Sequence, residues 1–267
     1  MNNFQLIKLL LQRPLAVLRS GLIAEQEFSY RNSMLRDYSI DRLPTVDLME
    51  LFPGFEEELS TYSFLEGTSL VSDIMLLKKL AKGFSSCNYL EIGSWRGESI
   101  INISEVSDKC TSLTLSPEEM KSMNISNDFI HVHGAFSKQA KNITEILHNS
   151  HTFDFGKLGQ TFDLIFIDGD HSYKGVLNDT QKTFNLRKDA TSIIVWHDYG
   201  FSTETVRHSV LKAILDGIPS DKHRNLYHVS NTMCAVYMEN KNFKTYHTKF
   251  PIYPNKKFNV KVRAEKI

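Results

Sequence analysis

The chain has 267 residues, with 31 Lys and Arg against 31 Asp and Glu, and 41% of its residues are hydrophobic. This composition excludes a disordered, collagen-like or coiled-coil chain and is typical of a globular protein. A net charge of zero argues against a dedicated nucleic-acid-binding protein, which usually carries a strong excess of basic residues. The three cysteines are far apart and form no metal-binding pair, so we expect a reduced, cytoplasmic setting.

The first 20 residues are rich in apolar side chains but are interrupted by charge. Lys8, Arg13 and Arg19 divide the apolar residues, so no run reaches the roughly 20 residues that a transmembrane helix needs. The segment contains no acid, which leaves two alternatives. One is contact with an anionic membrane surface, and the other is a helix packed on its own domain or on a second copy of the chain, as in a homodimer. We favour the second alternative.

The composition divides the chain into three parts. Residues 1–62 are predicted to be an N-terminal helical lead-in or lid, with little regular structure over 31–62 because proline and glycine interrupt the short apolar pieces. Residues 63–240 are predicted to be the main domain. Residues 241–267 form a basic tail with interleaved aromatic residues, which we expect to be largely solvated; contact with phosphates or nucleotide-linked sugars is the alternative.

Short apolar strands alternate with helices through the main domain. The predicted strands are 88–92, 112–115, 142–148, 162–167, 192–196, 226–230 and 234–238, and the predicted helices are 73–82, 97–106, 117–123, 173–186 and 204–215. Unbroken apolar strands between helices indicate a parallel sheet that is buried on both faces. The last two strands form a hairpin, which requires one antiparallel strand. The predicted fold is therefore α/β, with a doubly wound, mostly parallel sheet of about seven strands.

A glycine loop follows the first of these strands. Gly93 allows a tight turn close to a ligand, and Gly97 allows the next helix to begin close to the strand. Trp95 and Arg96 fill the space between them, so the loop is neither the dinucleotide-binding fingerprint nor a P-loop. Glu91 would repel a pyrophosphate at this position and suits a ligand that carries an ammonium group.

Three segments together resemble a known family. EIGSWRG (91–97), FDLIFIDGDHSY (162–173) and SIIVWHDYG (192–200) resemble class I S-adenosylmethionine-dependent methyltransferases, and most closely the small-molecule and sugar O-methyltransferases. The resemblance covers about residues 63–240 and implies a Rossmann-like fold with S-adenosylmethionine as cofactor. The residues that it implies for cofactor binding are Glu91, Gly93, Ser94, Trp95, Gly97, Thr114, Ser116, Asn149, Ser150 and Asp168.

Parts of this cofactor set depart from the family or have an alternative role. Thr114 and Ser116 stand where the family often has an acid that holds the ribose, while Asn149 and Ser150 follow the third strand, where the family usually contacts the adenine. Trp95 would stack over a ring or shield the sulfonium, or else pack in the core.

Acids and histidines follow two later strands of the sheet. Asp168, Asp170 and His171 come after strand 162–167, and His197 and Asp198 come after strand 192–196. If these strands are neighbours, the side chains converge near the glycine loop. Such a density of acids and imidazoles is costly unless a cation or a proton-transfer role compensates for it.

Two chemical interpretations of this cluster remain open, beside a structural one. In the first, Asp168 and Asp198 hold Mg²⁺, which lowers the pKa of a substrate hydroxyl; the family resemblance implies a further ligand where this chain has Tyr199. In the second, His171 or Asp170 removes the hydroxyl proton without a metal. The structural alternative is that the aspartates only cap the following helices.

The resulting hypothesis is methyl transfer from S-adenosylmethionine to a hydroxyl of a small molecule or glycan. The resemblance implies a sugar acceptor in a glycan or natural-product pathway. Two alternatives are a non-catalytic partner protein with the same fold, which the departures at Thr114 and Tyr199 would favour, and a nucleotide-dependent oxidoreductase, which Glu91 disfavours.

Overall fold

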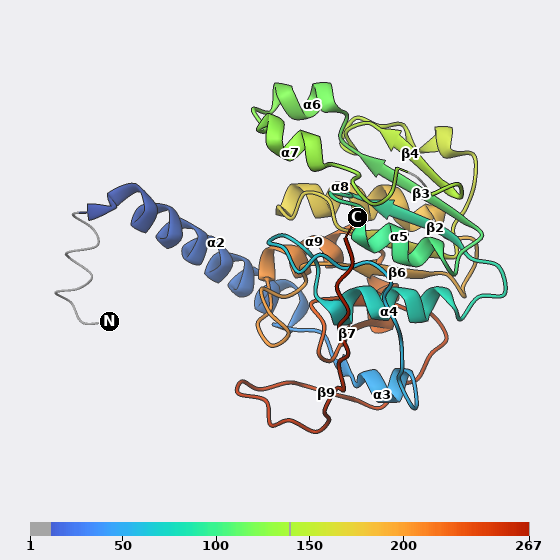
Figure 1. Cartoon of the computed structure of the whole chain (residues 1–267). Coiled ribbons are helices and arrows are strands. Elements are labelled where there is room, and N and C mark those ends of the chain that lie inside the picture. The colour runs from blue at the N-terminus through green and yellow to red at the C-terminus, as the bar shows by residue number, and fades with distance from the viewer. Residues whose placement is uncertain (1–11, 139, 267) are drawn as a thin grey trace.

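The computed structural model describes residues 12–138 and 140–266, and its central feature is one twisted sheet (Figure 1). The strand order is β4-β3-β2-β5-β6-β8-β7-β1-β9. The strands are β1 (Thr45–Val46), β2 (Asn88–Ile92), β3 (Lys109–Thr114), β4 (Ile143–Leu147), β5 (Leu164–Ile167), β6 (Ile193–Trp196), β7 (Leu226–Val229), β8 (Ala235–Tyr237) and β9 (Thr245–Tyr246). The helices are α2 (Pro14–Tyr38), α3 (Leu48–Leu51), α4 (Val71–Ala81), α5 (Glu98–Ser104), α6 (Pro117–Ser122), α7 (Asn127–Val132), α8 (Tyr173–Thr183) and α9 (His208–Gly217), with 3₁₀ turns at Phe155–Leu158, Phe184–Leu186 and Ser220–Asn225.

The pairing of the strands confirms the predicted mostly parallel sheet. Strands β4, β3, β2, β5 and β6 pair in parallel, and β8 is antiparallel to both β6 and β7. These seven strands are the predicted ones. Two short strands extend the sheet beyond β7: β1 is parallel to β7, and β9 is antiparallel to β1. The predicted lead-in and tail thus each add a strand to the sheet.

Helices cover both faces of the sheet. Because successive residues of a strand point to opposite faces, Leu90 packs in one core cluster with residues of α8 and α9, whereas Tyr89 packs in the other with residues of α4 and α5. Burial on both faces explains why the strands have unbroken apolar sequences. It also leaves the ends of the strands, and not their faces, for polar chemistry.

The N-terminal helix α2 is longer than the sequence predicted. It continues through Tyr38, so the expectation of little regular structure from residue 31 is wrong for its first turns. Its last part packs on α9, where Met34 is buried and Glu27 accepts a 2.6 Å hydrogen bond from the backbone N–H of His208. Its first part extends away from the domain (Figure 1), and Leu15 and Leu22 are 80% and 70% exposed there.

The structure tests the predictions for the first 20 residues only in part, because it describes residues 12–20 of this segment. Lys8 lies outside the described residues. In the part of the chain that the structure describes, we find no helix with both the length and the apolar character needed to cross a bilayer. Membrane contact and a homodimer both stay predictions.

Helix α9 begins later than predicted, at His208 and not at residue 204. The residues before it form a closed loop, in which the backbone N–H of Phe201 donates to the Thr205 carbonyl and that of Arg207 donates to the Tyr199 carbonyl, both at 2.8 Å. This loop follows β6 directly. It brings the Arg207 guanidinium to 3.4 Å from the Asp198 carboxylate.

The turn after β2 requires glycine at residue 93. Gly93 has φ +86°, and a Cβ atom there would lie 2.3 Å from the carbonyl oxygen of Asp168. Because backbone atoms cannot move aside, we expect Gly93→Ala to lower the free energy of unfolding by more than about 3 kcal/mol. The measurement is chemical denaturation followed by circular dichroism.

The matched control for this prediction is Gly54→Ala. Gly54 has φ +69°, but a Cβ atom there would meet no atom within 4 Å. The free energy of unfolding of this variant should fall by only about 1–2 kcal/mol, which is the cost of placing alanine in the left-handed backbone region. Equal losses in the two variants would show that the contact with Asp168 does not constrain the turn.

Candidate active site

Two neighbouring strands bring the acidic residues together, as predicted. β5 and β6 pair in parallel with Ile167 opposite Trp196, so the residues that follow leave the sheet side by side. The Nδ1 atom of His197 lies 3.0 Å from Asp168 Oδ1 and 3.1 Å from Asp198 Oδ2. Each of the three side chains offers a ligand atom within 4.8 Å of the others. We call Asp168, His197 and Asp198 the acid–imidazole cluster.

His197 lies between three carboxylates. Its Nδ1 faces Asp168 and Asp198, and its Nε2 lies 3.1 Å from Asp73 Oδ2. Burial works against a charged imidazole, but the negative charge of Asp168 and the hydrogen bonds to the carboxylates outweigh it. The pKa of His197 is therefore well above its usual value. A proton or a metal ion is needed to hold these charges together.

Asp198 also contacts His171, the residue proposed from the sequence as a base. His171 Nδ1 lies 2.9 Å from Asp198 Oδ2, and the His171 side chain is 47% exposed. Burial alone would raise the pKa of Asp198, but the two histidines lower it far below its usual value. Partial burial of His171 would lower its pKa, but the hydrogen bond to Asp198 raises it overall. With Nδ1 held by Asp198, Nε2 is the atom of His171 that can accept a proton.

Asp170, the other proposed base, is not brought into the cluster. Its carboxylate accepts hydrogen bonds from the backbone N–H and the hydroxyl of Ser172, at 2.9 and 2.7 Å. The nearest histidine nitrogen is that of His151, at 3.7 Å. Ser172 in turn caps α8, so Asp170 supports the start of this helix.

Tyr199 does not take the place of the further metal ligand that the resemblance implies. Its ring is buried, and its hydroxyl accepts a 3.0 Å hydrogen bond from the backbone N–H of Leu43. His197, the residue before Asp198, supplies the third donor of the cluster instead. The donor set of two carboxylate oxygens and one imidazole nitrogen fits a divalent cation.

Glu91 lies beneath the glycine loop and has no exposed surface. Its carboxyl group accepts hydrogen bonds from Tyr89 Oη at 2.7 Å and from Ser99 Oγ at 2.8 Å. Burial raises its pKa to about 8, and the two hydroxyl donors limit the rise. A cationic ligand on the loop would favour the ionised form of this carboxyl group.

The glycine loop also holds two polar atoms without partners. Within the described residues, the hydroxyl of Ser94 and the indole N–H of Trp95 are buried and form no hydrogen bond. The Trp95 ring stacks on Phe129 with 4.3 Å between centroids, so it packs against α7. Buried polar atoms without partners are rare in folded proteins, and they suggest that a ligand completes this loop.

The residues proposed for ribose and adenine lie at the ends of β3 and β4. The Thr114 hydroxyl bonds the Ser94 carbonyl and His133 Nε2, both at 3.0 Å, and so supports the glycine loop. Ser116 caps α6. Glu119 is not among the predicted cofactor residues; its carboxylate accepts a 3.0 Å hydrogen bond from the Asn149 backbone N–H and supplies an acid near these strand ends. Its place in the capping box after Ser116 was the available signal.

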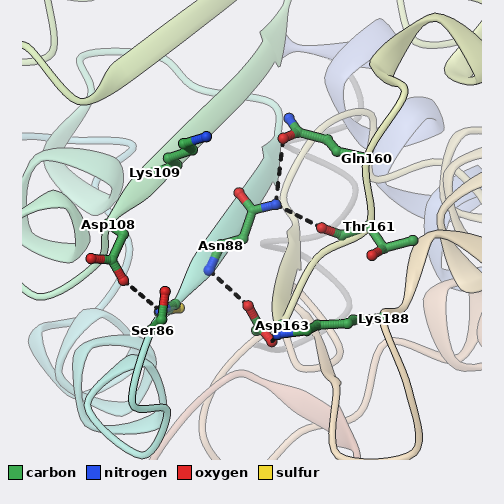
Figure 2. Close-up of a pocket in the computed structure, with 9 residues that line it drawn as sticks. Ser86, Asn88, Asp108, Lys109, Gln160, Thr161, Asp163 and Lys188 are labelled. Carbon is green, nitrogen blue, oxygen red and sulfur yellow. Dashed lines mark hydrogen bonds and ion pairs between the residues drawn. The ribbon is translucent and has the colours of Figure 1, made fainter.

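A hollow of about 400 Å³ lies at the opposite ends of the strands from the acid–imidazole cluster (Figure 2). It is lined by residues at the starts of β2, β3 and β5. Asp163 Oδ2 accepts from the Asn88 backbone N–H at 2.9 Å, and its Oδ1 lies 3.1 Å from Lys188 Nζ. In a parallel sheet, ligands bind at the carboxyl ends of the strands, so we place the site at the acid–imidazole cluster despite the size of this hollow.

Comparison with known proteins identifies the central segment. Residues 90–199 match a family whose members are described as a methyltransferase domain. No curated protein matches the chain. The solved structures that it resembles include the O-methyltransferase from Bacillus cereus in complex with SAH (14% identity, 66% of this chain and 84% of that chain, TM-score 0.45). They also include the O-methyltransferase TomG from Streptomyces achromogenes in complex with SAM (11% identity, 64% and 81%, TM-score 0.45). The resemblance to class I S-adenosylmethionine-dependent methyltransferases is confirmed over residues 90–199.

The buried Glu91 should make stability depend on pH. Between its usual pKa of 4.5 and its native value of about 8, the folded chain binds more protons than the unfolded chain, so stability falls as pH rises. Glu91→Gln mimics the protonated form and lacks this fall. From pH 6 to pH 8 we expect the variant to gain about 2 kcal/mol relative to the wild type in urea denaturation.

The control is Glu118→Gln, because Glu118 is exposed on α6. It should follow the wild type at every pH. If Glu91→Gln also follows the wild type from pH 6 to pH 8, Glu91 is ionised in the folded protein.

Proposed function

We propose that the protein transfers the methyl group of S-adenosylmethionine to a hydroxyl of a small molecule, with His171 as the base. The observation that carries the proposal is the 2.9 Å contact between His171 and Asp198, placed at the carboxyl edge of the sheet beside the glycine loop. The methyltransferase domain at residues 90–199 supports the reaction class.

The glycine loop is the proposed cofactor site. When bound, S-adenosylmethionine supplies an activated methyl group on a positively charged sulfur. Glu91 offers negative charge beneath the loop, and Ser94 Oγ and Trp95 Nε1 offer unused hydrogen-bonding capacity. Glu119 is our candidate for the ribose hydroxyls, because a carboxylate is a stronger acceptor than the hydroxyls of Thr114 and Ser116.

The proposed role of His171 is to remove the acceptor proton. Nδ1 donates to Asp198, which fixes the tautomer and leaves Nε2 to take the proton as the acceptor oxygen bonds to the methyl carbon. The half-exposed ring can be reached by an acceptor from solvent. The contribution of the protein is thus mainly alignment and proton removal.

A divalent cation at the acid–imidazole cluster is part of the proposal. Such an ion would polarise the acceptor hydroxyl and lower its pKa. Asp168 and Asp198 are the carboxylates that would hold it, and Mg²⁺ is the ion named from the sequence.

We propose a sugar or similar polyhydroxyl molecule as the acceptor. A hollow of about 210 Å³ at the same edge of the sheet supports a polar acceptor, since its lining includes Glu204, Asn231, Tyr246 and Lys256. The tail and the loop after β6 both contribute to this lining, so we propose that the tail helps to shape the acceptor pocket.

The direct test is calorimetry with S-adenosylmethionine, S-adenosylhomocysteine and NAD, followed by turnover with a panel of free and nucleotide-linked sugars. We expect both sulfur compounds to bind and mass spectrometry to detect an O-methylated product. Failure of both to bind would favour the non-catalytic partner protein, and binding of NAD alone would favour the oxidoreductase.

The pH profile tests the base. Because His171 must be neutral and its pKa is raised, kcat/KM should rise with pH through an apparent pKa above 6.5. His171→Ala should abolish this rise and lower kcat about 10²–10⁴-fold. The control His131→Ala changes an exposed histidine on α7 and should keep the wild-type profile. An unchanged profile in His171→Ala would exclude this residue as the base.

A further inference from the structure

We infer that Asp73, in the first turn of α4, is a positioning residue that makes His197 the nitrogen ligand of a cation site, and that this site prefers a first-row transition-metal ion to Mg²⁺. The inference rests on the proposed function only in taking Asp168 and Asp198 as the carboxylate ligands. It departs from the all-oxygen site that Mg²⁺ would require.

The two nitrogens of His197 face different partners. Nε2 lies 3.1 Å from Asp73 Oδ2, on the side away from the cluster, and Nδ1 lies 3.0 and 3.1 Å from Asp168 and Asp198. A carboxylate can only accept, so Nε2 carries the hydrogen that is donated to Asp73. By the same argument Nδ1 carries a hydrogen toward Asp168 and Asp198 when no cation is bound. A cation among these three side chains would replace that hydrogen and bind the Nδ1 lone pair, while the Nε2 hydrogen stays hydrogen-bonded to Asp73.

Asp73 is itself held firmly. It has no exposed surface, and its Oδ1 accepts a 2.9 Å hydrogen bond from the backbone N–H of Met233. Its Oδ2 accepts a 3.0 Å bond from the backbone N–H of Leu70, in addition to the contact with His197. Donors from the start of α4 and from the β7–β8 connection therefore fix the carboxylate. A fixed carboxylate behind a histidine is the arrangement that orients histidine ligands in metal sites.

The donor set determines which ions the site prefers. Mg²⁺ takes oxygen ligands and keeps its waters, so an imidazole adds little to its binding. Imidazole nitrogen binds later first-row ions more strongly, and affinity rises from Mn²⁺ through Fe²⁺ and Co²⁺. With His197 between Asp168 and Asp198, the cluster has two oxygen ligands and one nitrogen ligand. We therefore expect Co²⁺, the probe used below, to bind more tightly than Mg²⁺.

The partners of the other ligands agree with a built site. Asp198 is held from outside the cluster by His171 at 2.9 Å and by Arg207 at 3.4 Å. His197 and Asp198 thus each have a partner behind them, as ligands in metal sites commonly do. These partners come from α4, from the loop after β5 and from the loop before α9.

The experiment titrates the full-length, metal-stripped protein with CoCl₂ in the absence of any methyl donor, with visible absorption and calorimetry as readouts. We expect Co²⁺ to bind at one site at least 10-fold more tightly than Mg²⁺. The visible absorption bands of bound Co²⁺ should therefore remain when Mg²⁺ is added at equal concentration. Loss of the bands to equimolar Mg²⁺, or no binding of Co²⁺, would overturn the inference.

The variant Asp73→Asn tests the positioning role. The amide is the same size, but it is neutral and has one acceptor oxygen in place of two, so it cannot accept from both Met233 and Leu70 and no longer holds the Nε2 hydrogen of His197 with a charge. Co²⁺ affinity should fall 10- to 100-fold, while the weaker Mg²⁺ affinity stays unchanged. Asp154→Asn, an aspartate that caps a 3₁₀ turn far along the chain, is the matched control and should bind Co²⁺ like the wild type.

Two measurements keep the test decisive if Asp73→Asn fails to fold. In the wild type, long-range ¹⁵N NMR should show that added Zn²⁺, a diamagnetic ion, removes the His197 hydrogen on Nδ1 and leaves the hydrogen on Nε2, and loss of the Nε2 hydrogen instead would refute the inference. His197→Asn should lose the Co²⁺ bands and keep Mg²⁺ binding. Because none of these readouts uses S-adenosylmethionine, their failure would leave the proposed methyl transfer standing, and the reverse also holds.

Discussion

The parallel pairing of β5 with β6 is the constraint on which the candidate site depends. Ile167 lies opposite Trp196, so the residues that follow each strand leave the sheet at one level. A shift of one residue in this register would turn Asp168 and His197 toward opposite faces. The apolar residues of both strands are buried on both faces, which makes such a shift costly. The geometry of the polar site is therefore set by apolar packing beneath it.

The acidic and basic side chains at the carboxyl ends of β5 and β6 are paired with one another. Three carboxylates, Asp73, Asp168 and Asp198, surround His197, while His171 and Arg207 contact Asp198 from the other side. Buried charges are tolerated only when they are paired and hydrogen-bonded. Here the partners come from several elements, so the site requires the completed fold. That dependence is consistent with a rigid site whose orientation is established before a ligand arrives.

The fold and the main members of the site could be predicted because their signals are local. Apolar strands alternate with helices, and Asp168 and His197 directly follow two of those strands, with Asp198 one residue later. The contact of Asp73 with His197 could not be predicted, because the two residues are 124 positions apart in the sequence. The sequence around Asp73 indicates only the first turn of a helix. The strands β1 and β9 have two residues each, which is too short for a periodic pattern. The orientation of Asp170 depends on the capping of α8 by Ser172, a detail that sequence spacing does not specify.

Asp198 has one more feature with consequences for how this position can vary. Its φ of +55° places it in the left-handed region, which only glycine, asparagine and aspartate adopt at low cost. The backbone therefore accepts three residue types, and the contacts with His171 and His197 require the carboxylate among them. Asparagine or glycine at position 198 would keep this turn and lose the carboxylate, so the shape of the loop alone does not show that the charged contacts are present.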